Sequence, residues 1–147
     1  MRRPKEKVEK TVAIFIDGPN LLRKELTIDL REVKKAVKKY GRIIVSKVFL
    51  NQFAPQKLIE AIINEGFQAI IVLGEKEDSD VDVAMAVEAL DAIYKNDVDY
   101  IAIGTRDTDF LPVILKAKEC GKKVILLAVE SALSSSLKNA ADHVEFF

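Results

Sequence analysis

Aspartates are the side chains of this sequence best suited to chemistry, and they follow several of its apolar segments. Asp17 ends the segment TVAIFID, Asp107 and Asp109 follow YIAIG, and Asp82 stands at the start of a helical pattern. Two such charges about 4 Å apart repel by roughly 1 to 4 kcal/mol, so converging carboxylates bind a cation or retain protons. Oxygen ligands without His or Cys suit Mg²⁺ or Mn²⁺. The pattern therefore indicates a site for one of these ions.

Each acid also has a purely structural interpretation. Asp17 precedes a Gly-Pro pair and could begin a turn, and Asp82 lies in a first helical turn, where a carboxylate is favourable. Asp107 and Asp109 precede a helix, and we expect one of them to cap it and the other to face the crevice.

Three further acids lie close to these in the sequence. Asp78 and Asp80 are expected in a solvated loop. Glu88 follows Asp82 by six residues, which places it about 240° around a helix, so the two do not share a face. We expect Glu88 to face solvent or to support a ligand from behind.

Composition narrows the class of protein. The chain has 147 residues, 23 basic and 23 acidic, and a formal net charge of zero, so it is not polybasic. A single cysteine, Cys120, excludes a disulfide framework and a Cys-rich zinc site, and a single histidine, His143, makes a Ser-His-Asp triad unattractive. No stretch has the pattern of a membrane span or a signal peptide. We expect a cytoplasmic protein with no membrane and no disulfide-linked partner.

Apolar segments and helical patterns alternate along the chain. Predicted strands are Thr11–Ile16, Arg42–Leu50, Phe67–Leu73, Asp99–Ile103 and Lys123–Val129. Predicted helices are Asn20–Leu26, Asp29–Tyr40, Pro55–Glu65, Val81–Lys95, a helix ending at Cys120, and Ala132–Ala141. Strands that are apolar throughout indicate a parallel sheet covered on both faces, since each crossover is right-handed. The prediction is a three-layer α/β/α domain with a five-stranded parallel sheet.

We expect one domain over residues 11–147, preceded by a flexible basic arm over residues 1–10. Ligands of such sheets bind at the carboxyl ends of the strands, where the strand order reverses. The order 3-2-1-4-5 would gather Asp17, Asp107 and Asp109 in one crevice. Within the long helix, Val83, Val87, Leu90 and Tyr94 form one apolar stripe.

Four segments together resemble the NYN domain, a family of the PIN-like nuclease superfamily, and the LabA-like branch in particular. These segments are IFIDGPN, K-x-x-x-D-V-D-V-A-M-A, TRDTDFLPVI and S-x-L-x-x-A-A-D. The resemblance spans about residues 12 to 145. It implies a Rossmann-like PIN sheet and a divalent-metal-dependent ribonuclease.

The resemblance also implies roles for individual residues. The family's first Asp and its Asn match Asp17 and Asn20, and its later acids match Asp82, Asp107 and Asp109. Ser136 and Asp142 fall near a C-terminal Ser and Asp. Thr105 replaces the usual Ser and keeps a hydroxyl, whereas Arg106 stands where a small residue is typical.

A ribonuclease of this type would hold Mg²⁺ or Mn²⁺ through Asp17, Asp107 and Asp82, with Asp109 orienting water. Substrate contacts would come from Asn20, from Thr105, and from a basic rim. The rim candidates are Arg23, Lys24, Lys76 and Arg106. No aromatic stacking platform is evident, so we expect slight base specificity.

Other functions remain open or are disfavoured. A non-catalytic RNA-binding or regulatory module on the same fold is the alternative. A haloacid-dehalogenase-type phosphatase would need a second Asp two residues after Asp17, and Pro19 stands there; the sequence also has no phosphate-binding glycine loop. The C-terminal Phe146 and Phe147 could pack within the chain or form a homodimer contact.

Overall fold

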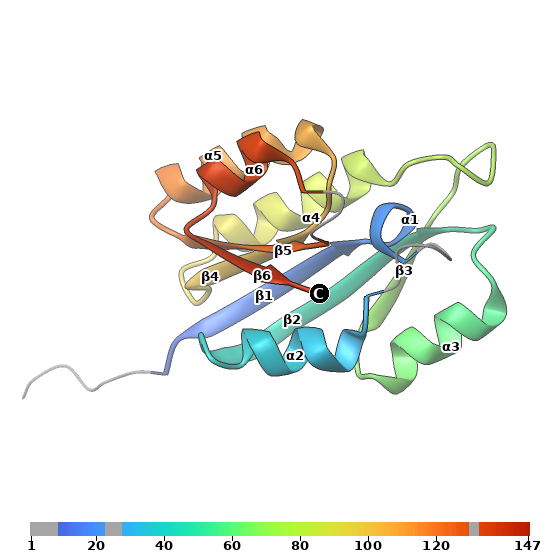
Figure 1. Ribbon diagram of the computed structural model, residues 1–147, viewed down its shortest axis with the longest axis horizontal. Coiled ribbons are helices and arrows are strands. Elements are labelled where there is room, and N and C mark those ends of the chain that lie inside the picture. Colours follow the sequence, from blue (N-terminus) through green and yellow to red (C-terminus); the bar gives the residue numbers. More distant parts are fainter. Residues whose placement is uncertain (1–8, 23–27, 130–132) are drawn as a thin grey trace, which may run out of the picture.

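A single parallel sheet forms the centre of the protein, in a computed structural model that describes residues 9–22, 28–129 and 133–147. Figure 1 shows its six strands and the helices that flank them. The strands are β1 (Thr11–Asp17), β2 (Arg42–Asn51), β3 (Gln68–Val72), β4 (Tyr100–Gly104), β5 (Lys123–Ala128) and β6 (His143–Phe146). Their order is β3-β2-β1-β4-β5-β6, with every pair parallel. The predicted order of the first five strands is confirmed.

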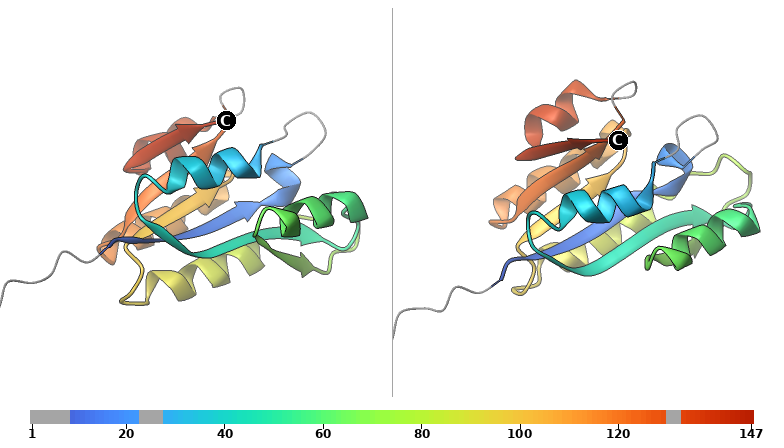
Figure 2. Two further views of the ribbon diagram at one scale, coloured as in Figure 1. Left: turned by 90° about the horizontal axis from the view of Figure 1, so that it is seen from below. Right: turned by 60° about the horizontal axis from the view of Figure 1, so that its bottom comes forward.

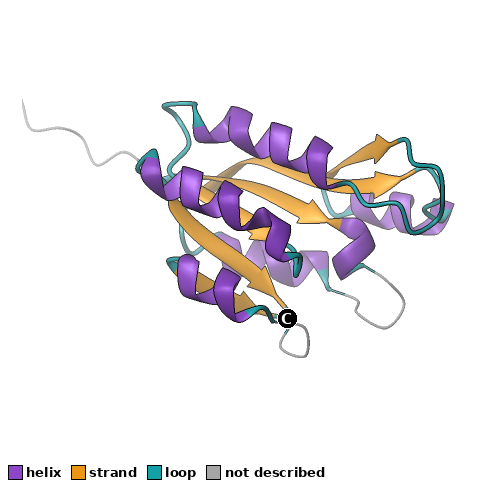
Figure 3. Cartoon of the chain, turned by 90° about the horizontal axis from the view of Figure 1, so that it is seen from above, coloured by secondary structure: helices purple, strands orange, loops and turns teal. Residues whose placement is uncertain are grey.

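Helices cover both faces of the sheet, so the predicted three-layer α/β/α architecture is confirmed (Figures 2 and 3). One face carries α1 (Gly18–Leu21), α2 (Leu30–Val37) and α3 (Gln56–Asn64). The other carries α4 (Asp82–Ile93), the 3₁₀ turn η1 (Thr108–Phe110), α5 (Leu111–Glu119) and α6 (Ser135–Ala140).

Two apolar cores lie on opposite faces of the central strand β1. Alternate residues of a strand point to opposite faces, and β1 is buried along its whole length. Ala13 and Phe15 pack beneath α4 and α5, whereas Ile14 and Ile16 pack beneath α1 and α2. This burial on both faces explains the continuous apolar run in the sequence.

The sixth strand, β6, was not predicted, and the expected count of five strands is wrong. β6 lies at the sheet edge and pairs only with β5, from Ile125–His143 to Ala128–Phe146. As an edge strand it is half-exposed and carries His143 and Glu145, so it lacks the apolar run that marks the interior strands. The adjacent Phe147 packs within the chain against the core beneath α2.

Three of the four residues in the apolar stripe of α4 do not face the sheet, although such a stripe normally packs on a core. The fourth, Leu90, is partly buried against the core. Val83, Val87 and Tyr94 are exposed by 77%, 57% and 63%. The buried side chains of α4 are instead Met85, Ala89, Ala92 and Ile93. Two small alanines on the buried face allow the helix to approach the sheet. The sequence pattern did not indicate this face because it is less hydrophobic than the stripe.

An aspartate side chain caps the start of α2. Asp29 caps the helix by accepting a hydrogen bond from the Arg31 N–H at 2.9 Å, and Glu32 lies in the first turn. The expected helix over 20–26 lies partly outside the described residues, as does most of the basic arm over 1–10. No helix in the described part of the chain is both long and apolar enough to span a membrane.

Candidate active site

The acids singled out in the sequence meet at the carboxyl ends of the central strands. Asp17 is the last residue of β1, and Asp107 and Asp109 follow the end of β4. Asp82 is the first residue of α4, which packs against β1 and β4. β1 and β4 are neighbours in the sheet, so the topology brings residues from three separate segments to one crevice.

Asp17 is fully buried, and the residue after it must be small. A Cβ on Gly18 would lie 2.5 Å from the carbonyl oxygen of Phe49, so only glycine lets the chain turn this close to β2. The Asp-Gly step therefore places a carboxylate at the strand end and lets the chain continue directly into α1.

Thr105 links Asp17 to the loop after β4. Its hydroxyl donates to Asp17 Oδ2 at 3.3 Å and accepts from the Asp107 N–H at 3.1 Å. Asp107 Oδ1 in turn accepts from the Asp109 N–H at 2.9 Å, which makes Asp107 the N-cap of η1. One chain of hydrogen bonds thus orients the three acids.

Three carboxylates form a compact group: one oxygen each from Asp82, Asp107 and Asp109 lies within 4.8 Å of the other two. Asp107 therefore both caps η1 and belongs to the acidic group, so the expected division of roles between Asp107 and Asp109 is wrong. The predicted ligand set was Asp17, Asp107 and Asp82. Asp17 is held beside the group through Thr105 and is not one of its three members.

The pKa of the Asp82 carboxyl group is raised to about 7. Burial is the main cause, and a hydrogen bond with Asp107 and the negative charges of Asp107, Asp80 and Asp17 act in the same direction. Its buried Oδ1 has no hydrogen-bond partner among the described residues. A buried carboxylate oxygen left without a donor is the environment that a cation would satisfy, so these side chains fit Mg²⁺ or Mn²⁺.

Two of the predicted rim residues, Lys76 and Arg106, lie in the described part of the chain. Lys76 is exposed in the loop before α4, and Arg106 is half-buried beside Asp107. Arg23, Lys24 and the side chain of Asn20 lie outside the described residues. Asp78 and Asp80 are exposed in the loop 74–80, as predicted.

Two residues suggested by the resemblance are not members of the acidic group. Asp142 accepts from the Val124 N–H at 2.8 Å, at the start of β5 and therefore at the opposite end of the sheet. It also lies 3.7 Å from Lys118 Nζ, so its evident role is structural. Ser136 is exposed on α6, where its hydroxyl lies 3.1 Å from that of Ser134.

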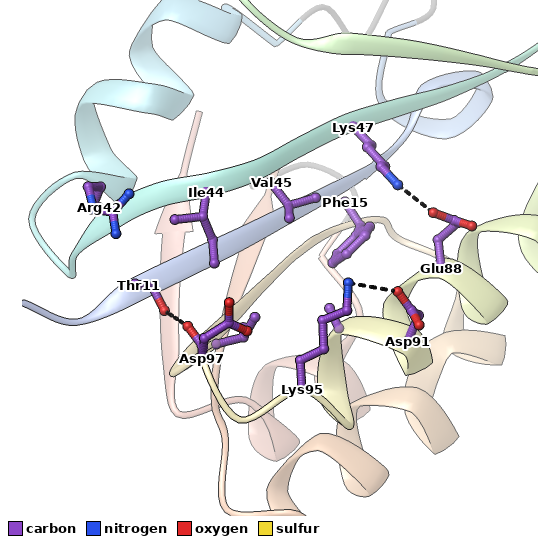
Figure 4. A pocket seen from close by; sticks show the side chains of 12 residues that line it. Thr11, Phe15, Arg42, Ile44, Val45, Lys47, Glu88, Asp91, Lys95 and Asp97 are labelled. Carbon is purple, nitrogen blue, oxygen red and sulfur yellow. Dashed lines mark hydrogen bonds and ion pairs between the residues drawn. The ribbon is translucent and has the colours of Figure 1, made fainter.

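Glu88 belongs to a separate cavity of about 380 Å³ between α4 and β2. Figure 4 shows its side chain pointing to Lys47 on β2, with a Glu88–Lys47 ion pair of 2.5 Å. Asp91 and Lys95 form a second pair in the same cavity, at 3.2 Å. The charges of this cavity therefore neutralise one another, and Glu88 contributes to packing between α4 and β2 rather than to the acidic group.

Asn51 is a buried polar residue whose importance the sequence did not reveal. Its side-chain amide donates to the carbonyls of Glu77 and Ser79 at 2.9 and 3.1 Å, and its Oδ1 accepts from the Phe53 N–H at 2.9 Å. The amide nitrogen therefore ties the end of β2 to the loop 74–80, and Oδ1 holds the turn that follows β2. The sequence feature that could have indicated this role is an Asn at the end of an apolar strand.

The fold is an α/β domain with a parallel sheet and an acidic group at the carboxyl ends of its strands. The family model of the NYN domain, which belongs to the PIN-like superfamily, matches residues 11–147, and the chain belongs to this family. Members of the NYN family are typically nucleases.

Two further proteins are similar to this chain. The uncharacterized protein MJ0482 of Methanocaldococcus jannaschii is 49% identical over 140 residues, which cover 95% of this chain and 56% of that protein. The chain thus spans little more than half the length of this curated relative. The crystal structure of VPA0982, a protein of unknown function from Vibrio parahaemolyticus, superposes with a TM-score of 0.83 at 18% identity, covering 98% of this chain and 96% of that one. At that identity the match shows a shared fold.

Proposed function

We propose that this protein is a divalent-metal-dependent ribonuclease that hydrolyses RNA phosphodiester bonds at the acidic group. The observation that carries the proposal is the convergence of Asp82, Asp107 and Asp109 within 4.8 Å, with a buried Asp82 oxygen that has no partner among the described residues. This group lies where ligands of parallel α/β sheets bind, in a domain of a nuclease family.

The acids have distinct parts in this proposal. Asp82, Asp107 and Asp109 hold Mg²⁺ or Mn²⁺, and Asp17 supports Asp107 through the Thr105 hydroxyl. When bound, such an ion supplies an activated water and stabilises negative charge on the phosphate oxygens. The carboxylates alone would repel RNA, so the ion also explains how a polyanion can approach this crevice.

Substrate would also meet positive charge at the edge of the crevice. Lys76 and Arg106 flank the acidic group in sequence and are at least partly exposed. We propose that both contact phosphates, together with Arg23 and Asn20. A few such contacts suit a domain whose net charge is zero, because binding then depends on a local patch.

The decisive experiment is cleavage of an end-labelled, mixed-sequence RNA in Mg²⁺, Mn²⁺ or EDTA. Asp107→Asn should reduce cleavage by more than the roughly 10- to 100-fold that loss of an outer partner of a metal ligand costs. Asp91→Asn is the matched control, since Asp91 is an exposed carboxylate of α4 that pairs with Lys95. The control should cleave like the wild type, and EDTA should abolish cleavage by both.

The alternative is an RNA-binding module that uses the same fold without catalysis. It predicts no metal-dependent cleavage, and RNA binding that is unchanged or stronger in Asp107→Asn, because the variant removes a negative charge. The same preparation of RNA and protein distinguishes the two functions when binding is measured beside cleavage. Membership of the LabA-like branch, cytoplasmic location and homodimer formation stay predictions from the sequence.

A further inference from the structure

A second cavity lies at the same end of the sheet as the acidic group. It has a volume of about 570 Å³ and lies between the start of α1, the turn after β2 and the loop 74–80. In Figure 1 these three segments lie at the carboxyl ends of the strands. Gly18 lines the cavity and directly follows Asp17, and Asp80 lines it two residues before Asp82. The negative charge of Asp80 acts on the carboxyl group of Asp82, so the cavity reaches the neighbourhood of the acidic group.

Apolar and acidic side chains line this cavity. Leu22, Leu50 and Leu58 are the apolar ones, and Phe53 adds an aromatic side chain that is 46% exposed. The carboxylates are those of Glu77, Asp78 and Asp80. No Lys or Arg lines the cavity in the part of the chain that the structure describes. Among these described residues, a flat, neutral group with N–H donors along one edge would find both an apolar surface and acceptors.

Hydrogen bonds brace the walls of the cavity against collapse. Asn51 ties the end of β2 to the loop 74–80 through the carbonyls of Glu77 and Ser79, and it also accepts from the Phe53 N–H. Gln52 makes a second connection, with its amide bonded to both the N–H and the carbonyl of Gly74 at 2.7 and 2.5 Å. A preformed cavity of this kind lowers the cost of ordering the protein when a ligand binds.

We propose that this cavity binds a nucleobase of single-stranded RNA, one that carries an exocyclic amino group. The base stacks on Phe53, and its amino edge donates to Glu77, Asp78 or Asp80. Carboxylates accept hydrogen bonds from amino groups such as cytosine N4, whereas uracil presents a carbonyl at that position and would be repelled. The base must leave its own stack to enter, which selects single strands. This inference rests on the proposed function, because it places the base next to the phosphate held at the acidic group.

The inference also changes an expectation from the sequence. A lone phenylalanine after a strand gave no sign of a stacking platform, and slight base specificity followed from that. In the fold, Phe53 lies on the wall of a cavity next to the acidic group. A preference for cytosine over uracil is the direct consequence.

The test measures binding of fluorescein-labelled hexamers of cytidine or uridine by anisotropy, in an Asp107→Asn background where the proposed function predicts no cleavage. The cytidine hexamer should bind several-fold more tightly than the uridine hexamer. Adding Phe53→Ala should weaken cytidine binding by about tenfold, as loss of base–aromatic stacking does. Phe53→Tyr should retain the binding. Asp78→Asn should narrow the difference between the two hexamers.

Leu73→Ala is the matched control, because Leu73 is 83% exposed and does not line the cavity. Equal binding of both hexamers, no binding of either, or an equal effect of Phe53→Ala and Leu73→Ala would each overturn the inference. The two proposals fail separately. Cytidine preference lost in Phe53→Ala, without any RNA cleavage by the wild type, would retain the base cavity and reject the ribonuclease. Metal-dependent cleavage, with cytidine binding unaffected by Phe53→Ala, would retain the ribonuclease and reject the base cavity.

Discussion

The Thr105 hydroxyl lies 3.3 Å from Asp17 Oδ2 and joins the ends of the neighbouring strands β1 and β4. Both residues are buried, and the same hydroxyl accepts from the Asp107 N–H. The resemblance to the NYN family implies a serine at this position. Serine and threonine both supply the hydroxyl that the two hydrogen bonds require.

Replacing Thr105 by valine should therefore destabilise the protein by about 1 to 3 kcal/mol, the usual effect of leaving a buried polar group without its partner. Thr105→Ser should stay close to the wild type, since it keeps the hydroxyl. Urea unfolding at neutral pH measures both. Thr108→Val provides the control, because Thr108 is exposed on η1. A Thr105→Val protein as stable as Thr108→Val would contradict this role of the hydroxyl.

Asp82 should make the metal-free protein less stable as pH rises. Its pKa is raised from 3.8 to about 7 in the folded protein, chiefly by burial. Between these values the unfolded chain has lost the proton that the folded protein still holds, so stability falls with increasing pH. Asp82→Asn removes this contribution, and its stability should depend less on pH in that window.

Urea unfolding in EDTA between about pH 4.5 and pH 8 checks the prediction about Asp82, because the window follows from its two pKa values. The quantity to compare is the difference in unfolding free energy between the wild type and the variant, since other carboxyl groups titrate in both. Asp91→Asn should give a curve parallel to the wild type. A constant difference between wild type and Asp82→Asn across the window would show that Asp82 has an ordinary pKa.

The orientation of α4 can be tested by a pair of alanine substitutions. Met85 is fully buried, so Met85→Ala should destabilise the protein by about 2 to 5 kcal/mol. Val87 is 57% exposed, so Val87→Ala should change stability by less than about 0.5 kcal/mol. Thermal or chemical unfolding of both variants decides the matter. Comparable losses would mean that the apolar stripe of the helix does face a core.

Asn51→Ala should loosen the loop 74–80 as well as destabilise the protein. The substitution leaves the Phe53 N–H and two carbonyls of the loop without their partner, an effect of about 1 to 3 kcal/mol for buried groups. Hydrogen exchange should show faster exchange of amides in residues 74–80, with α5 unaffected. Gln56→Ala is a control at the exposed start of α3. Uniform acceleration throughout the protein would indicate global destabilisation alone.

Much of the fold could be predicted because the interior strands are continuous apolar segments of the sequence. β1, β4 and β5 are apolar on both faces, and glycines follow several helices, so an alternating α/β chain with a parallel sheet could be predicted. The order of the strands did not follow from this pattern; it was the order that would gather the acids. β6 was not predicted because an edge strand pairs with only one neighbour and tolerates residues such as His143 and Glu145. The buried face of α4 could not be predicted from its apolar stripe, because the face that packs on the sheet contains small alanines.

The acidic site was partly predictable because acids that follow neighbouring parallel strands lie at the same edge of the sheet. The order 3-2-1-4-5 was the one that would bring Asp17, Asp107 and Asp109 together, and the structure has this order for its first five strands. The distances between these carboxylates depend on the directions of their side chains. The hydrophobic periodicity of the sequence does not give those directions. The hydroxyl of Thr105 and the cavity beside Phe53 arise from contacts between segments about 30 to 90 residues apart, as the bonds from Thr105 to Asp17 and from Asn51 to the loop 74–80 illustrate.

Metal binding should depend on the proton of Asp82. Ligand carboxylates must be ionised, and the pKa of this one is raised to about 7, so affinity for Mn²⁺ should fall as pH drops below 7. At 100 times the dissociation constant, a bound ion stabilises the folded protein by about 2.7 kcal/mol. Mn²⁺ should therefore raise the melting temperature strongly at pH 8 and weakly at pH 6. Asp91→Asn should behave like the wild type, whereas Asp107→Asn should lose the shift at both pH values. A shift of equal size in Asp107→Asn would place the ion elsewhere and would remove the basis for assigning hydrolysis to this group of carboxylates.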